Sequence, residues 1–446
     1  MSSLPQVMQP LVPLVEVQRV FCLMKMAGQL LVVERQQVTD VLSGVWRGEV
    51  DFYRAADATK LIRRFLEQLP VSSDSRQVIS SFWIDSATHV YDAIAFSPLP
   101  TPLTTLNYWV PSPVVPQSGD WSVIGEFLRD VICDGDGVLY EYLIGYLAHM
   151  LQKPEEKPGV MLVLLGGQGT GKGTFFVLVR RVWPRTTLQV SDVDEVTGKF
   201  NAALERNYVI CMDEALFSGD RKALDRLKSL VTERHVTVEQ KHQPRREIES
   251  FHRFFAASNH DHFAKVAPDD RRFVFLRVSD AHKEDHGYFK TVHTALLDDA
   301  AISAMVYDLL ALDLSGFNVR DRPKTQEHTE QKLKSLEGFD RYWFEVLQTG
   351  DLSGGGAGAI SKPWDKNPFV GTAALRQNCE RFHSAVRQFH TLQAQYISAG
   401  LKKWCPQAVS TRKVEHGNQV RGYNLPSLTV ARQAFESGIG GQVDWQ

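Results

Sequence analysis

The sequence predicts an α/β protein built around a parallel sheet, with smaller regions before and after it. Two observations favour this fold class. Residues 160–320 alternate short apolar strands with helical patterns, which is typical of a parallel sheet covered by helices. A glycine-rich stretch, Gly166 to Thr174, directly follows the first apolar strand and precedes a helical pattern. A strand, a glycine loop and a helix in this order are typical of phosphate-binding sites.

Composition limits the class of protein. The chain has 446 residues, a net charge of −2 and 43% hydrophobic residues, so any nucleic-acid contact depends on local basic surfaces. Its five cysteines are scattered and form no CxxC pair, which favours a reducing compartment without disulfides or a zinc site. No apolar run reaches the length of a membrane span, and no signal peptide is evident. We therefore expect a cytoplasmic protein that does not contact a membrane.

Breaks in composition divide the chain into four parts. Residues 1–118 read as an α+β region with one clear helix, and residues 119–157 contain two helical apolar stripes separated by a turn. Residues 158–335 hold the alternating strands and helices. Residues 336–446 begin after them with a glycine-rich linker and continue as a helical and then strand-rich basic region.

The glycine stretch fits the GxxxxGK pattern of a P-loop. Glycines let backbone N–H groups turn inward around phosphates, and the N-terminus of the following helix adds its positive dipole end. Lys172 is expected to reach the β- and γ-phosphates of ATP. The usual hydroxyl after the lysine is replaced by Gly173, so Thr174 is the nearest hydroxyl for Mg²⁺. The expected nucleotide-binding residues are Gly166, Gly167, Gln168, Gly169, Thr170, Gly171, Lys172, Gly173 and Thr174.

A second apolar strand, 208–212, ends in two acids. In a parallel sheet its carboxyl end lies beside the glycine loop. We expect Asp213 to hold Mg²⁺ together with Thr174, and Glu214 to orient and deprotonate an attacking water. A strand that merely ends in surface acids is the alternative interpretation.

Two further candidates follow along the chain. Asn259 ends the apolar strand 254–257 and is expected to contact the γ-phosphate or the water. Arg271 and Arg272 are candidates for an arginine that a neighbouring subunit supplies to the transferring phosphoryl group. A turn asparagine, and a local ion pair with Asp269 or Asp270, are the alternatives.

Taken in order, these motifs resemble superfamily 3 helicases of the phage and plasmid primase–helicase type. The resemblance rests on the P-loop, the strand ending in Asp213 and Glu214, the strand ending in Asn259, and residues 270–273. Residues 198–201, 227–241, 107–109, 423–427 and 431–432 also fit. It covers roughly residues 90–446.

This resemblance implies an AAA+-like P-loop ATPase core that forms a homo-hexamer around single-stranded DNA. It also implies a helical collar at 119–157 and a β-hairpin, 236–239 with 248–255, that points into the pore. The hairpin tip would offer positive charge to DNA phosphates through Lys241, His242, Arg245 and Arg246. The implied function is ATP-dependent DNA unwinding for replication of a phage, satellite or plasmid.

The C-terminal part carries a local excess of basic residues. Residues 376–432 contain nine lysines or arginines and two acids, which suggests a winged-helix-like DNA-binding domain. Its candidates for DNA contact are Lys402, Lys403, Arg412, Lys413 and Arg421. A basic helical cap without a DNA role is the alternative.

Other functions compete with unwinding. A ring ATPase of the same fold that acts in signalling or defence without unwinding DNA fits the same motifs. A nucleoside monophosphate kinase is disfavoured because about 165 residues precede the glycine loop. The N-terminal part lacks paired strand acids and zinc ligands, so we expect a separate primase or replication initiator as a partner.

Overall fold

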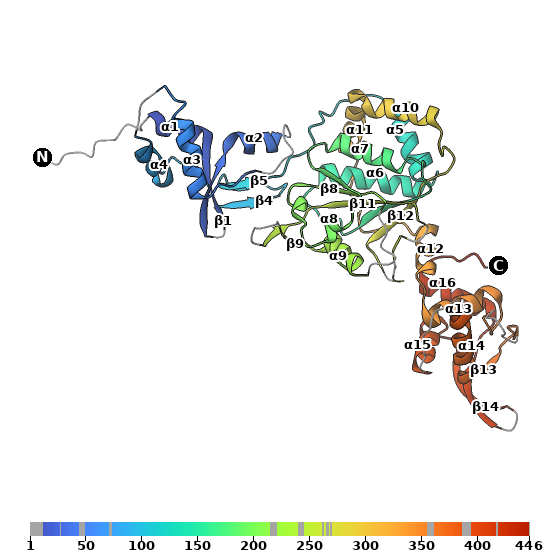
Figure 1. The fold of residues 1–446 in the computed structure, drawn as a ribbon. Coiled ribbons are helices and arrows are strands. Elements are labelled where there is room, and N and C mark those ends of the chain that lie inside the picture. The colour runs from blue at the N-terminus through green and yellow to red at the C-terminus, as the bar shows by residue number, and fades with distance from the viewer. Residues whose placement is uncertain are drawn as a thin grey trace.

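The computed structural model describes most of the chain and divides into an N-terminal region, a central region and a C-terminal region (Figure 1). The described residues are 12–26, 28–43, 50–70, 74–214, 221–239, 245–260, 263–264, 267, 270–354, 361–385, 394–415 and 418–445. Among these residues, no helix combines the length and apolar character needed to cross a membrane.

The N-terminal region is a small α+β unit. Antiparallel strands β1 and β2 pair with each other, and β3 adds to β1 in parallel. Helices α1, α3 and α4 bury one apolar cluster against them, and Val17, Val32, Ile62 and Phe82 are fully buried in it. The elements are α1 (Val12–Val20), β1 (Phe21–Met26), β2 (Gln29–Glu34), α2 (Arg35–Ser43), α3 (Ala55–Leu66), α4 (Ser75–Ile84), β3 (Val90–Tyr91), β4 (Ala93–Ala95) and β5 (Thr105–Asn107).

The segment expected to be helical at 119–157 is helical. Asp136 caps its long helix by accepting hydrogen bonds from the backbone N–H groups of Val138 and Leu139, at 2.9 and 3.0 Å. One part that periodicity does not predict is a π-helix, whose wider turn buries Phe127, Leu128, Val131 and Ile132 together. The elements are α5 (Ser122–Glu126), the π-helix η1 (Phe127–Ile132) and α6 (Gly137–Gln152).

A five-stranded parallel sheet forms the central region, in the order β12-β6-β11-β8-β7. Its strands are nearly continuous apolar runs because helices cover both faces (Figure 1). The elements are β6 (Met161–Leu165), α7 (Lys172–Val182), β7 (Thr187–Val190), α8 (Asp194–Thr197), the 3-10 helix η2 (Ala202–Arg206), β8 (Val209–Met212), α9 (Arg221–Thr232), β9 (His235–Val238), β10 (Arg246–Glu249), β11 (Arg253–Ser258), β12 (Phe273–Arg277), α10 (His286–Leu297) and α11 (Asp299–Ala311).

Two apolar clusters lie on opposite faces of this sheet. Leu162 and Leu164 point to the face covered by α6, α7 and α11, whereas Met161, Val163 and Leu165 point to the face covered by α9. After β6 the chain crosses to the edge strand β7, and β8 and β11 then lead back toward β6. The last strand, β12, lies on the other side of β6, so the direction in which strands are added changes at β6. The carboxyl end of such a strand is where ligands bind in open α/β sheets.

The C-terminal region packs around its own core, with Trp343 and Trp404 fully buried. The expected β-ribbon is present as the antiparallel pair β14 and β15, in which Arg412 lies opposite Arg421. The elements are α12 (Gln326–Lys334), α13 (Gly338–Thr349), β13 (Phe369–Gly371), α14 (Thr372–Ala385), α15 (Ala394–Trp404), β14 (Val409–Glu415), β15 (Asn418–Asn424) and α16 (Leu428–Ile439).

Candidate functional site

The glycine loop links β6 to α7 at the carboxyl edge of the sheet. Gly169 and Gly171 have φ values of 78° and 100°, which residues other than glycine rarely adopt. A Cβ at Gly171 would also lie 2.8 Å from the ring of Phe289. Thr170 closes the loop by donating its hydroxyl to the carbonyl oxygen of Gly167, at 2.9 Å. The loop therefore needs glycine at Gly171 both for its backbone conformation and for space.

Lys172 begins α7 and turns its amine back into the loop. The Nζ atom donates to the carbonyl oxygens of Gly166 and Gly167, at 2.7 and 2.5 Å, and only 7% of the residue is exposed. Burial lowers the pKa of Lys172, and nearby carboxylates, first that of Asp213, act in the opposite direction. The amine is thus held at the floor of an open cavity of about 490 Å³.

Two acids meet the loop from β8. The backbone N–H of Asp213 donates to the carbonyl oxygen of Val190 at 2.8 Å, and Gln189 donates to the Asp213 carboxylate at 3.2 Å. Glu214 has a φ of 52°, a left-handed conformation that costs about 1–2 kcal/mol for a residue with a side chain. Such strain is often found where a side chain is held for a ligand. Asp213 and Glu214 both line the cavity of Lys172.

The same cavity includes most of the nucleotide residues expected from the sequence. Asn259 follows β11 and lines it, and the backbone N–H of Gly166 donates to the carbonyl oxygen of Ser258 at 3.3 Å. Gln168 to Thr174 form its floor. Gly166 and Gly167 do not line the cavity, but they supply the carbonyls that hold Lys172.

One wall of the cavity comes from α10, which the sequence analysis missed. His286, Phe289 and His293 lie three and four residues apart on one helix face and line the cavity with Val177. His293 Nε2 lies 3.5 Å from the hydroxyl of Thr174. The helical spacing of two histidines and a phenylalanine after the helix cap Asp285 was the available signal.

The two candidate arginines lie elsewhere. Arg272 precedes β12, and its carbonyl oxygen accepts from the N–H of Met161 at 2.8 Å, at the amino edge of the sheet. Five residues of β6 separate that edge from the glycine loop, which amounts to roughly 15 Å. Arg271 is exposed, and Arg272 lies 3.8 Å from Asp270. The structure thus does not bring either arginine to the cavity of its own chain.

The expected DNA contacts are only partly described. A hairpin forms from β9 and β10, but its return strand is Arg246–Glu249, and residues 253–255 of the expected return strand belong to β11 of the parallel sheet. Lys241 and His242 at the hairpin tip lie outside the described residues. Arg245 pairs with Glu239 at 2.5 Å, and Arg246 pairs with Glu205. On the C-terminal region, Lys403 pairs with Asp340 at 2.9 Å, whereas Lys402, Arg412, Lys413 and Arg421 are exposed.

The donors in the cavity suit a hard cation. The hydroxyl of Thr174 and the carboxylates of Asp213 and Glu214 are oxygen ligands, which Mg²⁺ prefers. The described residues contain no group of three or more His, Cys, Asp or Glu side chains that could hold a metal ion by themselves. Mg²⁺ usually binds through one or two carboxylates together with the phosphates of a bound nucleotide.

The sequence is similar to one family model and to a curated protein. Residues 164–272 match a family of unknown function, DUF5906. The DNA Primase-polymerase of Nitratiruptor phage NrS-1 is 24% identical over 223 residues, which cover 47% of this chain and 31% of that protein. The chain therefore spans about a third of the length of this curated relative.

The solved structures give the fold. The A form apo structure of the NrS-1 C-terminal region has a TM-score of 0.66 at 16% identity and covers 94% of this chain and 100% of that chain. A second apo structure of this region has a TM-score of 0.62 at 15% identity and covers 93% and 99% of the two chains. The chain has the fold of this C-terminal region.

The comparisons correct the expected fold class. We expected an AAA+-like P-loop ATPase core with a helical collar and a winged-helix-like C-terminal domain. The fold is instead that of the NrS-1 C-terminal region. Alternating strands and helices indicate a parallel sheet, but strand order, the π-helix and the packing of outer regions depend on tertiary contacts that the pattern does not specify.

The expected family, function and enzyme class are also wrong. We expected a superfamily 3 helicase, an ATP hydrolase that unwinds DNA, with a ring ATPase in signalling or defence as the alternative. The relative found is named a DNA Primase-polymerase. The sequence motifs predicted a site for phosphates and Mg²⁺, and enzymes that unwind DNA and enzymes that synthesise it both bind nucleoside triphosphates. The motifs therefore do not identify the reaction.

Proposed function

We propose that this chain is part of a phage-type DNA-replication protein of the primase-polymerase class, and that its glycine-loop cavity binds a nucleoside triphosphate with Mg²⁺. The observation that carries the proposal is the meeting of the Lys172 amine, the Asp213 carboxylate and the glycine loop in one open cavity at the carboxyl edge of the sheet. The NrS-1 relative supports the replication role and fits a DNA partner.

Each part of the cavity has a separate task in this proposal. Backbone N–H groups of the loop and of the first turn of α7 surround the phosphates, and Lys172 donates to them in place of its two carbonyl acceptors. Asp213 and Thr174 would hold Mg²⁺, which would supply positive charge that stabilises the triphosphate. The Glu214 carboxylate would accept a hydrogen bond from water in the cavity, and Asn259 would donate to the terminal phosphate.

The base of the nucleotide lies against the wall formed by α10. His286, Phe289 and His293 give this wall three aromatic rings, two of them imidazoles that can form hydrogen bonds. ATP is one nucleoside triphosphate that the cavity accommodates, and its phosphate contacts do not depend on the base. Binding measured with all four ribonucleoside and deoxyribonucleoside triphosphates would show how selective the wall is.

Assembly and compartment are finer parts of this proposal. Arg271 is exposed at the amino edge of the sheet, so it approaches a nucleotide only from another copy of the chain, as in a homo-hexamer. The five cysteines are free and buried, which suits the reducing cytoplasm of a host cell. Mass measurement with nucleotide and single-stranded DNA tests the hexamer.

Titration of a fluorescent nucleoside triphosphate tests the cavity. Lys172→Ala should lower the affinity about 10- to 100-fold, because a hydrogen bond from a charged donor contributes about 1.5–3 kcal/mol. Asp213→Asn should keep the affinity measured in EDTA but lose the gain from added Mg²⁺. Lys60→Ala, which removes an exposed lysine on α3, is the matched control and should bind as the wild type does.

A labelled-nucleotide incorporation assay on a primed single-stranded template tests the role in replication. We expect incorporation by the whole replication protein to fall in Lys172→Ala in step with nucleotide affinity. Equal nucleotide affinity in Lys172→Ala and the wild type would show that the nucleoside triphosphate does not bind in this cavity as proposed. If Lys172→Ala loses nucleotide affinity but keeps full nucleotide incorporation, the synthesis is carried out by residues outside this cavity.

A further inference from the structure

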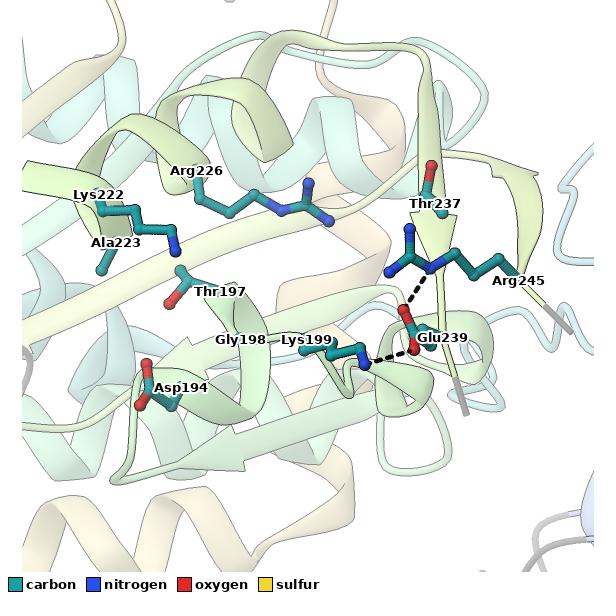
Figure 2. Close-up of a pocket in the computed structure, with 10 residues that line it drawn as sticks. All are labelled: Asp194, Thr197, Gly198, Lys199, Lys222, Ala223, Arg226, Thr237, Glu239 and Arg245. Atoms are coloured by element: carbon teal, nitrogen blue, oxygen red, sulfur yellow. Dashed lines mark hydrogen bonds and ion pairs between the residues drawn. The ribbon is translucent and has the colours of Figure 1, made fainter. Parts of the chain in front are cut away.

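A second and larger cavity lies on the face of the sheet that carries α9. Its volume is about 810 Å³, and it opens between α9, the end of α8 and the strand β9 (Figure 2). Four cationic side chains and two carboxylates line it: Lys199, Lys222, Arg226, Arg245, Asp194 and Glu239. We call this space the basic cavity. Its charged lining carries a net positive charge and shares no residue with the nucleotide cavity.

Helix α9 places two of these cations. Lys222 and Arg226 are four residues apart and therefore lie on one helix face. The opposite face is fixed in the apolar core by Leu224, Leu227 and Val231. Figure 2 shows both long side chains extending from α9 into the basic cavity. Both side chains line the cavity, and among the described residues no ion pair joins either of them to a carboxylate.

The other two cations share one carboxylate. Glu239 lies 3.4 Å from Lys199 Nζ and 2.5 Å from Arg245 Nε (Figure 2). One carboxylate neutralises only one of the two charges, while it holds both side chains at the same wall. A bound phosphate would gain from the remaining positive charge without any rearrangement of the backbone.

An exposed aromatic ring, that of Phe200, lies next to Lys199 at the edge of the basic cavity. Phe200 is 52% exposed, and the Nζ atom of Lys199 lies 5.3 Å from its ring centroid. The next residue, Asn201, is 1% exposed and ties this segment to β9: its amide donates to the Thr237 carbonyl at 3.2 Å and accepts from the Glu239 N–H at 3.1 Å. Lys199 and Phe200 are thus presented to solvent from a firmly attached segment.

We propose that the basic cavity and Phe200 bind single-stranded DNA, with the cations on consecutive phosphates and the ring stacked on an unpaired base. Basic grooves with interleaved aromatic faces are the usual means of binding single strands without sequence preference. A duplex keeps its bases stacked inside, so it would leave Phe200 without a partner. The inference rests on the proposed role in DNA replication but uses residues distinct from the nucleotide site.

Fluorescence anisotropy with a labelled 20-nucleotide oligothymidine tests the proposal on the full chain. Reversal of both α9 charges, Lys222→Glu with Arg226→Glu, should weaken binding at least 10-fold. It should also reduce the slope of log affinity against log salt by about 1.4, since each lost phosphate contact on a single strand contributes about 0.7. Phe200→Leu should weaken binding about 5- to 10-fold without changing that slope, because stacking is not an ionic contact.

The matched control reverses two exposed charges far from the cavity, Arg63→Glu with Arg64→Glu on α3, and should bind as tightly as the wild type.

Nucleotide titration of every variant separates this proposal from the preceding one, because all should bind the nucleoside triphosphate normally. Equal losses in the α9 and α3 variants would overturn the proposal, as would wild-type affinity in the α9 variant. Wild-type affinity in Phe200→Leu would overturn the stacking contact. Unlabelled inorganic triphosphate that displaces the labelled strand as well as unlabelled oligonucleotide does, at equal phosphate concentration, would also overturn the proposal of a single-strand site.

Discussion

The two edges of the central sheet use the same residue type in opposite ways. At the carboxyl edge, the amine of Lys172 donates to two loop carbonyls on the floor of an open cavity. At the amino edge, the amine of Lys157 donates to the Leu230 and Glu233 carbonyls and the Ser250 hydroxyl, at 2.7, 2.6 and 2.5 Å. Lys172 can exchange its partners for a ligand, whereas three fixed protein acceptors surround the Lys157 amine.

This difference separates the lysine proposed to bind a ligand from a structural one. Lys172 is buried and Lys157 is half-buried, and both have a lowered pKa, so the direction of the shift does not distinguish them. What distinguishes them is the cavity in front of Lys172 and the oxygen donors across it, Asp213 and Glu214. Substitutions at the carboxyl edge should therefore affect ligand binding, and substitutions at the amino edge should affect stability.

The largest effect is expected at the glycine loop. Gly171→Ala places a side chain at a φ of 100° and 2.8 Å from the Phe289 ring. We expect nucleotide affinity to fall more than 100-fold and the free energy of unfolding to fall by about 2–3 kcal/mol, because strain and overpacking add. Titration and urea unfolding measure the two. Gly137→Ala, where a Cβ meets nothing within 4 Å and which does not line the cavity, is the control and should stay folded and bind nucleotide. Normal binding by Gly171→Ala would show that the loop does not need this conformation.

The amino edge should show its effect in stability and its pH dependence. Burial and the charge of Arg253 lower the pKa of Lys157 to about 7, against the opposing effect of Glu233. Above pH 7 the folded protein thus holds fewer protons at this site than the unfolded chain, whose lysine titrates near 10.4. Stability from this group therefore rises with pH, by up to about 1.4 kcal/mol per pH unit.

Lys157→Met removes that dependence. Urea unfolding at pH 7.5 and 8.5 should show a gain for the wild type that exceeds the gain for Lys157→Met by about 1 kcal/mol. The variant should also be less stable at pH 8.5 by about 1–3 kcal/mol, because buried acceptors lose their donor. Its nucleotide affinity should equal that of the wild type. Parallel pH profiles would contradict the position given to Lys157, and lost nucleotide binding would remove the contrast between the two edges.

The smallest effect is expected at Arg271. Its side chain is exposed and lies at the edge away from the nucleotide cavity, so Arg271→Ala should change stability by no more than about 0.5 kcal/mol. At concentrations where the chain is monomeric, nucleotide affinity should be unchanged. A loss that grows with protein concentration would show that another copy supplies the arginine. A loss in the monomer would contradict the placement at the amino edge.

Local sequence pattern predicted the parts of the site that follow buried strands. The apolar runs at 160–165, 208–212 and 254–257 correspond to β6, β8 and β11, and the residues after them, Lys172, Asp213 and Asn259, meet in one cavity. In a parallel sheet all such residues gather at one edge, so their meeting needs no knowledge of strand order. The ribbon of β14 and β15 was predicted from its residues because it is a local pairing, whereas the hairpin of β9 and β10 was expected only from the family resemblance.

Other parts depend on contacts between distant segments. His293 reaches Thr174 across 119 residues because α10 packs against α7, and nothing near either residue signals that contact. The basic cavity joins Lys199, Lys222 and Arg245, which come from three different elements. The reaction was mispredicted because a glycine loop, two acids and an asparagine predict contacts to phosphates and do not specify which bond changes.

A crystal structure of the chain with a non-hydrolysable nucleoside triphosphate and Mg²⁺ tests the central claim most directly. The account predicts phosphate oxygens within about 3.2 Å of the backbone nitrogens of residues 169–173, with the Lys172 amine moved from the carbonyls of Gly166 and Gly167 onto a phosphate. A triphosphate bound elsewhere would contradict the account. So would an empty loop at saturating nucleotide, with Lys172 still bonded to both carbonyls.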